Sequence, residues 1–322
     1  MGEFELIARF FERPVRRSPL GVGDDCALLQ PALGMQLAVS TDLLVEGRHF
    51  LSTVDPQRLG HKALAVNLSD LAACGAQPLA FTLSLALPHV EEAWLAGFAQ
   101  GLFALADAHG CELVGGDTTR GPLAINVTVF GEVPAGQALL RSGARPGDDV
   151  WVSGSLGDAR LALEAFRGTV SLPQEVFEAA RQRLERPEPR VALGLALRGI
   201  ASAAIDVSDG LAGDLGHVLR RSGVGATLAL ASAPQLLAAA RSGLQLAPQM
   251  VEQLVFAGGD DYELAFTAPA SARDAVQSAA QRTATPVTQV GRIEAAPGLR
   301  LLDAAGQPIA RSFGGFDHFG AS

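Results

Sequence analysis

Aspartates beside glycine, serine or threonine recur along this chain, bordered by apolar segments. They stand in six short motifs: GVGDD (21–25), STD (40–42), NLSD (67–70), GGDTT (115–119), IDVSDG (205–210) and GGDDYE (258–263). Carboxylates gathered this densely would repel one another unless cations lay between them. Mg²⁺ prefers hard oxygen ligands and is usually shared between a few carboxylates and a substrate's phosphates. The motifs therefore predict a site for several magnesium ions and a nucleotide.

The chain lacks the lysine-based phosphate sites of many other nucleotide-binding proteins. It contains no GxxxxGK[ST] loop and neither the HRD nor the DFG motif of protein kinases, and Lys62 is its only lysine. If the chain transfers a phosphoryl group, metal ions must carry most of the charge neutralisation that lysine shares in those families.

Alternating patterns predict the elements that position these motifs. Strands are expected over 35–41, 78–88, 112–116, 123–133 and 202–207, the fourth of them alternating between apolar and polar residues. Helices are expected over 56–73, 91–110, 156–167, 174–185 and from Asp209 to about Arg221. Asp55 is the predicted N-cap of the first of these helices, and Pro56 its first residue. Asp42 and Asp117 are thereby expected at or just beyond strand ends.

Eight segments, in this order, resemble those of the thiamine-monophosphate kinase family, which belongs to the ATP-binding superfamily that includes aminoimidazole ribonucleotide synthetase. They are GVGDDCALL, STDLLVEGRHF, HKALAVNLSDLAACGAQP, GGDTTRG, RSGARPGDDVWVSG, AIDVSDGL, AGGDDYEL and GGFDHF. The resemblance implies an α/β (α+β) fold of two domains and a homodimer. It also implies ATP-dependent phosphorylation of thiamine monophosphate to thiamine diphosphate with Mg²⁺ as cofactor. No general base and no covalent nucleophile are expected.

A chain of 322 residues, 48% of them hydrophobic, is long for one domain and ample for buried cores. We expect an N-terminal ATP- and Mg²⁺-binding, dimer-forming domain over 1–135 and a C-terminal α/β domain over 136–322 that completes the active site. The formal charge of −9 argues against nucleic-acid binding and suits a protein that recruits cations.

Three widely spaced cysteines without a CxxC pair are typical of a reduced cytosol. The first residues, MGEFELIARFF, do not have the pattern of a secretory signal. No run approaches the ~18 apolar residues of a membrane span. We therefore expect a cytoplasmic protein without membrane contact.

The resemblance places the family's ligands on this chain one by one. Its magnesium ligands fall on Asp25, Thr41, Asp42, Asp70, Asp117, Asp206 and Asp209. Its nucleotide contacts fall on Asp25, Thr41, Gly116, Asp117, Arg141 and Ser208. The GGD motif adds a reason of its own, because glycine allows the backbone to approach a phosphate closely.

Structural alternatives remain open at several of these positions. Asp24 and Asp25 would also suit hydrogen bonds to backbone amides within a turn. Asp42 and Asp209 would each suit a cap on the segment that follows. Arg141 would also suit an ordinary surface position. As an ordered set, however, the motifs favour metal binding.

The acceptor site is predicted by resemblance alone. His49, Asp260, Glu263 and Phe316 match positions that contact thiamine monophosphate, with Phe316 offering an aromatic face to the cationic rings. Packing or turn roles remain open for all four.

The chain lacks the residues that are typical of superfamily members with other functions. The superfamily members that act on other substrates carry a lysine in the STDLLVEGRHF segment, an N-terminal cysteine with a nearby lysine, or a C-terminal cysteine, and this chain has none of these. Another acceptor within the superfamily stays open. So does a cation-binding module without catalysis, although no DxDxDG loop is present.

Overall fold

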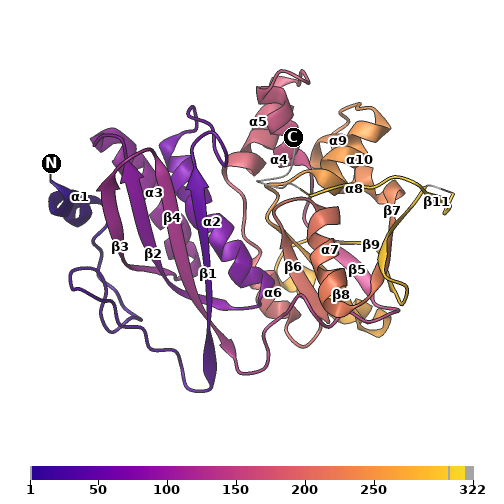
Figure 1. The fold of residues 1–322 in the computed structure, drawn as a ribbon, viewed down its shortest axis with the longest axis horizontal. Coiled ribbons are helices and arrows are strands. Elements are labelled where there is room, and N and C mark those ends of the chain that lie inside the picture. Colours follow the sequence, from indigo (N-terminus) through magenta and orange to yellow (C-terminus); the bar gives the residue numbers. More distant parts are fainter. Residues whose placement is uncertain (1, 304, 316–322) are drawn as a thin grey trace. The chain divides into compact units, whose positions relative to one another are not determined.

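The structure, a computed structural model, describes residues 2–303 and 305–315 (Figure 1). The chain packs as two compact units. The first comprises Met1–Leu71 with Ala76–Gly136, and the second comprises Ala72–Gly75 with Gln137–Ser322. Each contains its own sheet, so each is described separately.

The first unit is built on a four-stranded sheet in the order β1-β4-β2-β3. Its strands are β1 (Met35–Val45), β2 (Gln77–Leu87), β3 (Glu112–Arg120) and β4 (Ala124–Pro134), and its helices are α1 (Glu3–Phe10), α2 (Pro56–Ala73) and α3 (Glu92–His109). β4 runs antiparallel to β1 and β2, and β2 runs parallel to β3. Along β4, buried residues alternate with half-buried ones. One face of the sheet is therefore packed, under α2 and α3, and the other is open (Figure 1).

Local signals fix both long helices. The Asp55 carboxylate accepts hydrogen bonds from the backbone N–H groups of Gln57 (2.9 Å) and Arg58 (3.2 Å), which confirms the predicted N-cap of α2. α3 ends at Gly110, whose φ of 59° lies in the left-handed region that favours glycine.

Two strands are longer than predicted. β1 pairs with β4 as far as Val45, and β3 pairs with β2 as far as Arg120. The expected ends at residues 41 and 116 were therefore wrong, because partner strands supply hydrogen bonds beyond the apolar runs. Asp42 and Asp117 lie within strands, where successive side chains point to opposite faces.

The second unit is built on a seven-stranded sheet in the order β11-β10-β7-β9-β5-β8-β6. Its strands are β5 (Asp149–Ser153), β6 (Ala203–Val207), β7 (Gly225–Ala229), β8 (Glu263–Ala268), β9 (Val287–Glu294), β10 (Gly298–Leu302) and β11 (Pro308–Ile309). All neighbouring pairs are antiparallel except β10 with β7. β5, β6 and β8 are buried at every position, as expected for strands covered on both faces.

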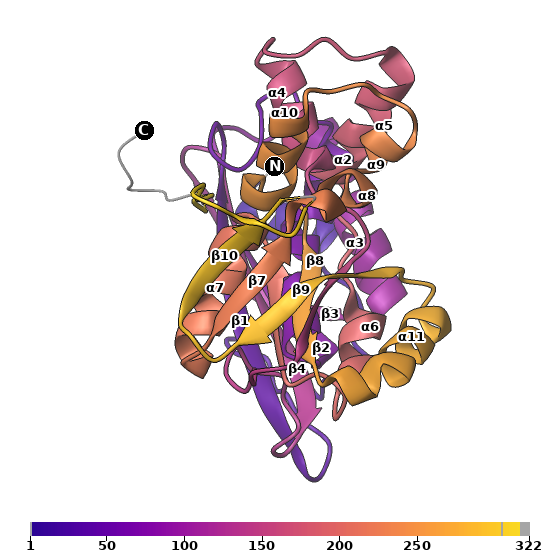
Figure 2. The same cartoon turned by 90° about the vertical axis from the view of Figure 1, so that its right-hand side faces the viewer.

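Helices cover both faces of this sheet. They are α4 (Asp158–Phe166), α5 (Gln174–Glu185), α6 (Val191–Leu197), α7 (Leu211–Ser222), α8 (Ala233–Leu236), α9 (Ala238–Arg241), α10 (Pro248–Ala257) and α11 (Arg273–Arg282), with two short 3₁₀ turns at Leu230–Ser232 and Ala270–Ala272. Figure 2 shows α7 on one side of the sheet and α6 with α11 on the other. The main core contains the apolar faces of α7 and α10, so the loop before α7 is held on a rigid base.

Among the described residues, no helix combines the length and the apolar character that crossing a membrane requires. The three cysteines form no disulfide: Cys26 is exposed, Cys74 half-buried and Cys111 buried.

Candidate nucleotide and metal site

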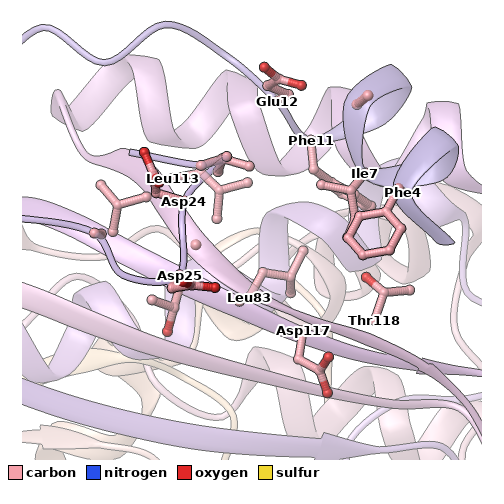
Figure 3. Close-up of a pocket in the computed structure, with 18 of the residues that line it drawn as sticks. Phe4, Ile7, Phe11, Glu12, Asp24, Asp25, Leu83, Leu113, Asp117 and Thr118 are labelled. Carbon is pink, nitrogen blue, oxygen red and sulfur yellow. The ribbon is translucent and has the colours of Figure 1, made fainter. Parts of the chain in front are cut away.

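Three aspartates of the first unit share an open pocket of about 760 Å³, which Glu3 and Glu12 also line. Asp24 and Asp25 come from the loop after Gly23, and Asp117 comes from the edge strand β3. Figure 3 shows these side chains at the pocket wall, with Phe4, Ile7 and Phe11 of the α1 segment on another side. All three carboxylates are exposed to solvent. The pocket therefore combines hard oxygen donors with an apolar wall.

The other predicted ligands of the first unit lie on both faces of its sheet. Residues directly opposite one another across a ladder share a face. The register aligns Thr41 with Thr128 and Thr82, and it aligns Asp117 with Ser84. Thr41 and Asp117 thus lie on the open face. The Thr41 hydroxyl is already within 2.9 Å of the Thr128 hydroxyl and donates to the Val127 carbonyl (3.1 Å).

Asp42 and Asp70 lie on the opposite, helix-covered face. Asp42 pairs with the buried Val127. One step earlier on the same face, the Ser40 hydroxyl donates to the Asp70 carboxylate of α2 at 2.5 Å. The half-buried Asp70 carboxylate thus has a hydrogen-bond partner in Ser40, the first residue of the STD motif.

Gly116 has a structural reason to be glycine. Its φ is 149°, and a β-carbon there would lie 1.8 Å from the Leu83 carbonyl oxygen of the neighbouring strand β2. Close approach to a protein backbone, and not only to a phosphate, therefore excludes a side chain at this position. A β-carbon on Gly115 would meet nothing within 4 Å.

His49 is half-buried in the turn after β1. The Val45 N–H donates to its Nδ1 (3.0 Å), and the Lys62 ammonium donates to its carbonyl oxygen (3.1 Å). Because Nδ1 accepts, the neutral ring carries its proton on Nε2. His49 is thereby fixed in the tautomer that can donate to an anion.

In the second unit, the end of β6 and the loop after it carry three predicted site residues. Asp206 lies in β6, and Ser208 and Asp209 lie in the loop before α7. The N-cap of α7 is Gly210 without a side-chain cap, so capping by Asp209 is not the role that this structure gives it. Instead, the Asp214 carboxylate inside α7 accepts from the N–H groups of Ser208 and Asp209, both at 3.0 Å.

Asp214 was not among the predicted site residues, because in the sequence it looks like an ordinary acidic residue in the first turn of a helix. Burial raises its pKa to about 7, and the charge of Asp209 adds to the rise, against the backbone hydrogen bonds that lower it. The loop is therefore fixed by a carboxylate that the structure holds almost fully buried.

The GGDDYE segment runs beside this loop. The N–H of Asp260 donates to the Ser208 carbonyl (2.8 Å), and that of Tyr262 donates to the Val207 carbonyl (2.8 Å). Asp260 and Tyr262 both have positive φ, 65° and 52°. Such backbone strain is uncommon outside glycine and clusters at functional sites. The backbone of Asp260 thus lies beside Ser208.

Arg141 is exposed and tied to the other end of α7, where its carbonyl accepts from the Ser222 hydroxyl (3.3 Å). Burial and then the charges of Arg220 and Arg141 lower the pKa of His217, while Asp209 opposes them. His217 therefore lies within electrostatic range of both Arg141 and Asp209.

Glu263 is placed in the protein interior. It is fully buried, with Arg183 and Arg190 each 2.7 Å away and the Ser153 hydroxyl at 2.6 Å. Burial alone would raise its pKa, but the hydrogen bond and charge of Arg190, the charge of Arg183 and the Ser153 hydroxyl lower it. These partners make Glu263 part of a buried ion pair, whereas Asp260 of the same motif is half-buried. Phe316 lies outside the described residues.

The donor set fits Mg²⁺ in kind. Within residues 2–303 and 305–315, no three His, Cys, Asp or Glu side chains converge so as to hold a metal ion by themselves. Mg²⁺, however, keeps several waters and is typically bound through one or two carboxylates plus substrate phosphates. Asp25 and Asp117, both exposed on one pocket, are oxygen donors of this kind, and a bound nucleotide would supply further oxygens.

Comparisons with known families agree with this geometry. The model of the AIR synthase related protein N-terminal domain matches residues 23–133, and that of the AIR synthase related protein C-terminal domain matches residues 145–304. Fold and motifs thus define a two-domain protein of the AIR synthase related class, which confirms the predicted fold.

Individual relatives narrow the class. Thiamine-monophosphate kinase of Salmonella typhimurium is 46% identical over 324 residues, covering 99% of this chain and 98% of the relative. A crystal structure of thiamine-monophosphate kinase from Stenotrophomonas maltophilia matches with a TM-score of 0.84 and 46% identity, covering 95% and 96% of the two chains. AaThiL complexed with AMPPCP and TMP matches with a TM-score of 0.75 and 30% identity over 90% and 89%. The chain belongs to the thiamine-monophosphate kinase family.

Proposed function

We propose that this chain transfers the γ-phosphoryl group of ATP to the phosphate of thiamine monophosphate, giving ADP and thiamine diphosphate. The observation that carries the proposal is the 46% identity to thiamine-monophosphate kinase along nearly the full length of both proteins. A relative that is 30% identical has been solved with AMPPCP, a non-hydrolysable ATP analogue, and TMP.

The transfer is direct. An oxygen of the thiamine-monophosphate phosphate forms a bond to the γ-phosphorus of ATP while the bond from that phosphorus to the β–γ bridging oxygen breaks. The acceptor's second pKa of about 6 leaves it mostly dianionic near neutrality, so no general base is needed. Positioning and charge neutralisation are then the main requirements.

The residues of each unit divide this work. Asp25 and Asp117 of the first unit and Asp206 and Asp209 of the second would hold Mg²⁺, which supplies neutralisation of the phosphate charge when bound. Thr41, Asp42 and Asp70 stay in the proposed ligand set, with Asp42 and Asp70 on the covered face of the sheet. Gly116 and Ser208 remain proposed nucleotide contacts through their backbones.

Three side chains would meet phosphates or the acceptor directly. The Arg141 guanidinium offers a planar fork to a phosphate of the nucleotide. The Nε2–H of His49, fixed by the hydrogen bond at Nδ1, would donate to the acceptor phosphate. Asp260, held beside Ser208, and Phe316, which lies outside the described residues, are proposed to contact the thiamine end.

We further propose a homodimer formed through the open side of the first sheet. The edge strand β1 presents Leu37, Val39 and Leu43 on that face, and these side chains are 44%, 59% and 53% exposed. Apolar residues on an exposed edge strand are a liability for a monomer, and pairing with a second copy would remove it. The cytoplasmic location remains a proposal, which three widely spaced cysteines that form no disulfide support.

The test is product formation. The purified protein is incubated with ATP, Mg²⁺ and thiamine monophosphate, with free thiamine as a parallel acceptor, and the thiamine species are separated by chromatography. We expect thiamine diphosphate in step with ADP, from the monophosphate only. ATP binding that depends on Mg²⁺ without this product would point to another acceptor, and tight Ca²⁺ binding without any nucleotide effect would point to a cation-binding module.

A further inference from the structure

The N-terminal helix α1 presents an apolar stripe to the pocket that holds Asp25 and Asp117. Phe4, Ile7 and Phe11 recur at helical spacing, and all three line this pocket (Figure 3). Phe11 is only 4% exposed and Ile7 is half-buried, but Phe4 is 83% exposed. The Phe4 ring is therefore the most open part of the stripe, and it lies on the same pocket as the carboxylates.

Other side chains hold α1 to the first unit. Leu6 is fully buried, and the Phe11 ring meets the Phe98 ring of α3 edge to face, with centroids 6.5 Å apart and planes 77° apart. The mostly exposed Phe4 ring adds little to this attachment. Since exposed side chains contribute little to stability, a substitution at Phe4 should leave the helix in place.

The two sides of the pocket suit a ligand with two different ends. Asp25 and Asp117 attract cations and repel a phosphate that arrives without Mg²⁺. The opposite wall offers an aromatic face, which suits a flat ring system. The volume of about 760 Å³ lies within the range of about 300–1,000 Å³ that is typical of small-molecule sites. A nucleotide with Mg²⁺ on its phosphates has both ends.

We propose that Phe4 binds the base of the nucleotide: its ring stacks on the adenine of ATP while Asp25 and Asp117 hold Mg²⁺ on the phosphates. This inference rests on the proposed function. It adds an aromatic contact to a nucleotide site whose other proposed members are aspartates, a glycine, an arginine and hydroxyl residues. Every base has a π face, so stacking supplies affinity and tolerates a change of base.

The test compares a ligand that has a base with one that has none. Kd is measured by calorimetry, in the presence of Mg²⁺, for AMPPCP and for inorganic tripolyphosphate, which keeps the phosphate chain and lacks the nucleoside. The full-length wild type is compared with Phe4→Ala, with Phe4→Leu, which keeps apolar bulk without a π face, and with Phe4→Trp, which keeps the π face. Phe10→Ala is the matched control, because this second ring of α1 lies under the Arg9 guanidinium at 5.1 Å and does not line the pocket.

We expect Kd for AMPPCP to rise about tenfold in Phe4→Ala, by less in Phe4→Leu, and to stay within about twofold of the wild type in Phe4→Trp. Kd for tripolyphosphate should be the same in all of these proteins, because the base is the part of the ligand that Phe4 contacts. KM for thiamine monophosphate should not change in the Phe4 variants. Phe10→Ala should bind AMPPCP as the wild type does.

Several results would overturn the inference. Equal Kd values for AMPPCP in the wild type and Phe4→Ala would remove Phe4 from the site. A parallel rise in Kd for tripolyphosphate would place the effect on the phosphates and not on the base. A loss of self-association in Phe4→Ala with unchanged Kd, measured by sedimentation, would assign the exposed ring to a contact between subunits. If Phe4→Ala loses melting temperature, equal Kd values for Phe4→Leu and Phe4→Trp would contradict the inference.

Failure of the proposed function gives a different result. A wild-type protein that binds AMPPCP with Mg²⁺ but makes no thiamine diphosphate would contradict the proposed acceptor, and the variants would still decide the role of Phe4. A wild type that makes thiamine diphosphate, with a Phe4→Ala variant that binds AMPPCP equally well, would contradict the role of Phe4 alone.

Discussion

The acidic motifs of the two units differ in what surrounds their carboxylates. In the first unit, Asp24, Asp25 and Asp117 are exposed on one pocket. In the second, Asp261 and Glu263 of the GGDDYE motif are completely buried, one against the Gly157 N–H and the other between two arginines. Burial of a charge is tolerated only when it is paired or hydrogen-bonded. Motifs that look alike in sequence therefore differ in their surroundings: among these five carboxylates, the three exposed ones are proposed for ligand binding and the two buried ones hold the fold.

The largest expected effect is a loss of activity when one of the exposed aspartates of the first unit is substituted. Asp117→Asn keeps the shape of the side chain and removes its charge, so kcat/KM should fall by about 10³ or more while the melting temperature stays unchanged. Asp274→Asn, at an exposed residue of α11, is the control and should behave as the wild type. Near-normal turnover of Asp117→Asn across Mg²⁺ concentrations would remove this residue from the site.

Substitution of a buried carboxylate in the second unit should lower the stability of the fold. Glu263→Ala leaves Arg183 and Arg190 without their buried partner, so the free energy of unfolding should drop by about 3–5 kcal/mol. Glu164→Ala breaks the partly exposed pairs with Arg160 and Arg167 and should cost about 0–1 kcal/mol. Urea denaturation measures both. A loss for Glu263→Ala no greater than that for Glu164→Ala would erase the contrast between buried and exposed carboxylates.

The pKa values of the two buried acids are shifted in opposite directions, so their contributions to stability should depend on pH in opposite ways. Burial raises the pKa of Asp261 well above its usual 3.8 in spite of the hydrogen bond from Gly157. Its contribution to stability is complete below 3.8 and is lost as pH rises through the folded pKa, by up to about 1.4 kcal/mol per pH unit. Asp261→Asn should therefore become more stable relative to the wild type as pH rises from 4 upward.

Glu263 has the opposite sign. Its folded pKa lies below the usual 4.5, so its contribution is present above that value and is lost as pH falls through the folded pKa. The free energy of unfolding, measured between about pH 3 and 8 for the wild type, Asp261→Asn and Glu263→Gln, separates the contributions of the two residues. Parallel curves for the wild type and Asp261→Asn would contradict the assignment of the raised pKa.

The smallest effect comes from an exposed carboxylate that is structural. Asp55→Ala removes the N-cap of α2 and should cost about 1 kcal/mol of stability. Its kcat should equal that of the wild type at a temperature where both are folded. A loss of turnover comparable to that of Asp117→Asn would contradict the purely structural role assigned to Asp55.

Local rules predicted the local features. The bounds of α2 and its Asp55 cap follow from chemistry within a few residues, and the structure confirms both. The ends of β1 and β3 were wrong because they depend on hydrogen bonds from other strands. The ordered motifs also identified the family, since order along the chain needs no three-dimensional information.

Long-range partners lay beyond sequence reasoning. Glu263 was predicted to contact the substrate, yet it pairs with arginines 80 and 73 residues earlier in the chain. Thr41 and Asp42 were grouped as neighbours, yet strand alternation places them on opposite faces once β1 extends through both. Asp214, which holds the Asp209 loop, carries no sequence mark that separates it from ordinary polar residues. Ser40 stands in the STD motif, but its hydrogen bond to Asp70, 30 residues later, could not be predicted from that motif.

The most direct test of the proposed metal site is to locate the bound ions. Crystals grown with Mn²⁺, which shares the oxygen preference of Mg²⁺, and a non-hydrolysable ATP analogue would give anomalous peaks at the bound ions. We expect peaks within coordination distance of the Asp25 and Asp117 carboxylates, and their loss in Asp117→Asn. Nucleotide bound with no peak at these two residues would contradict the proposed metal site.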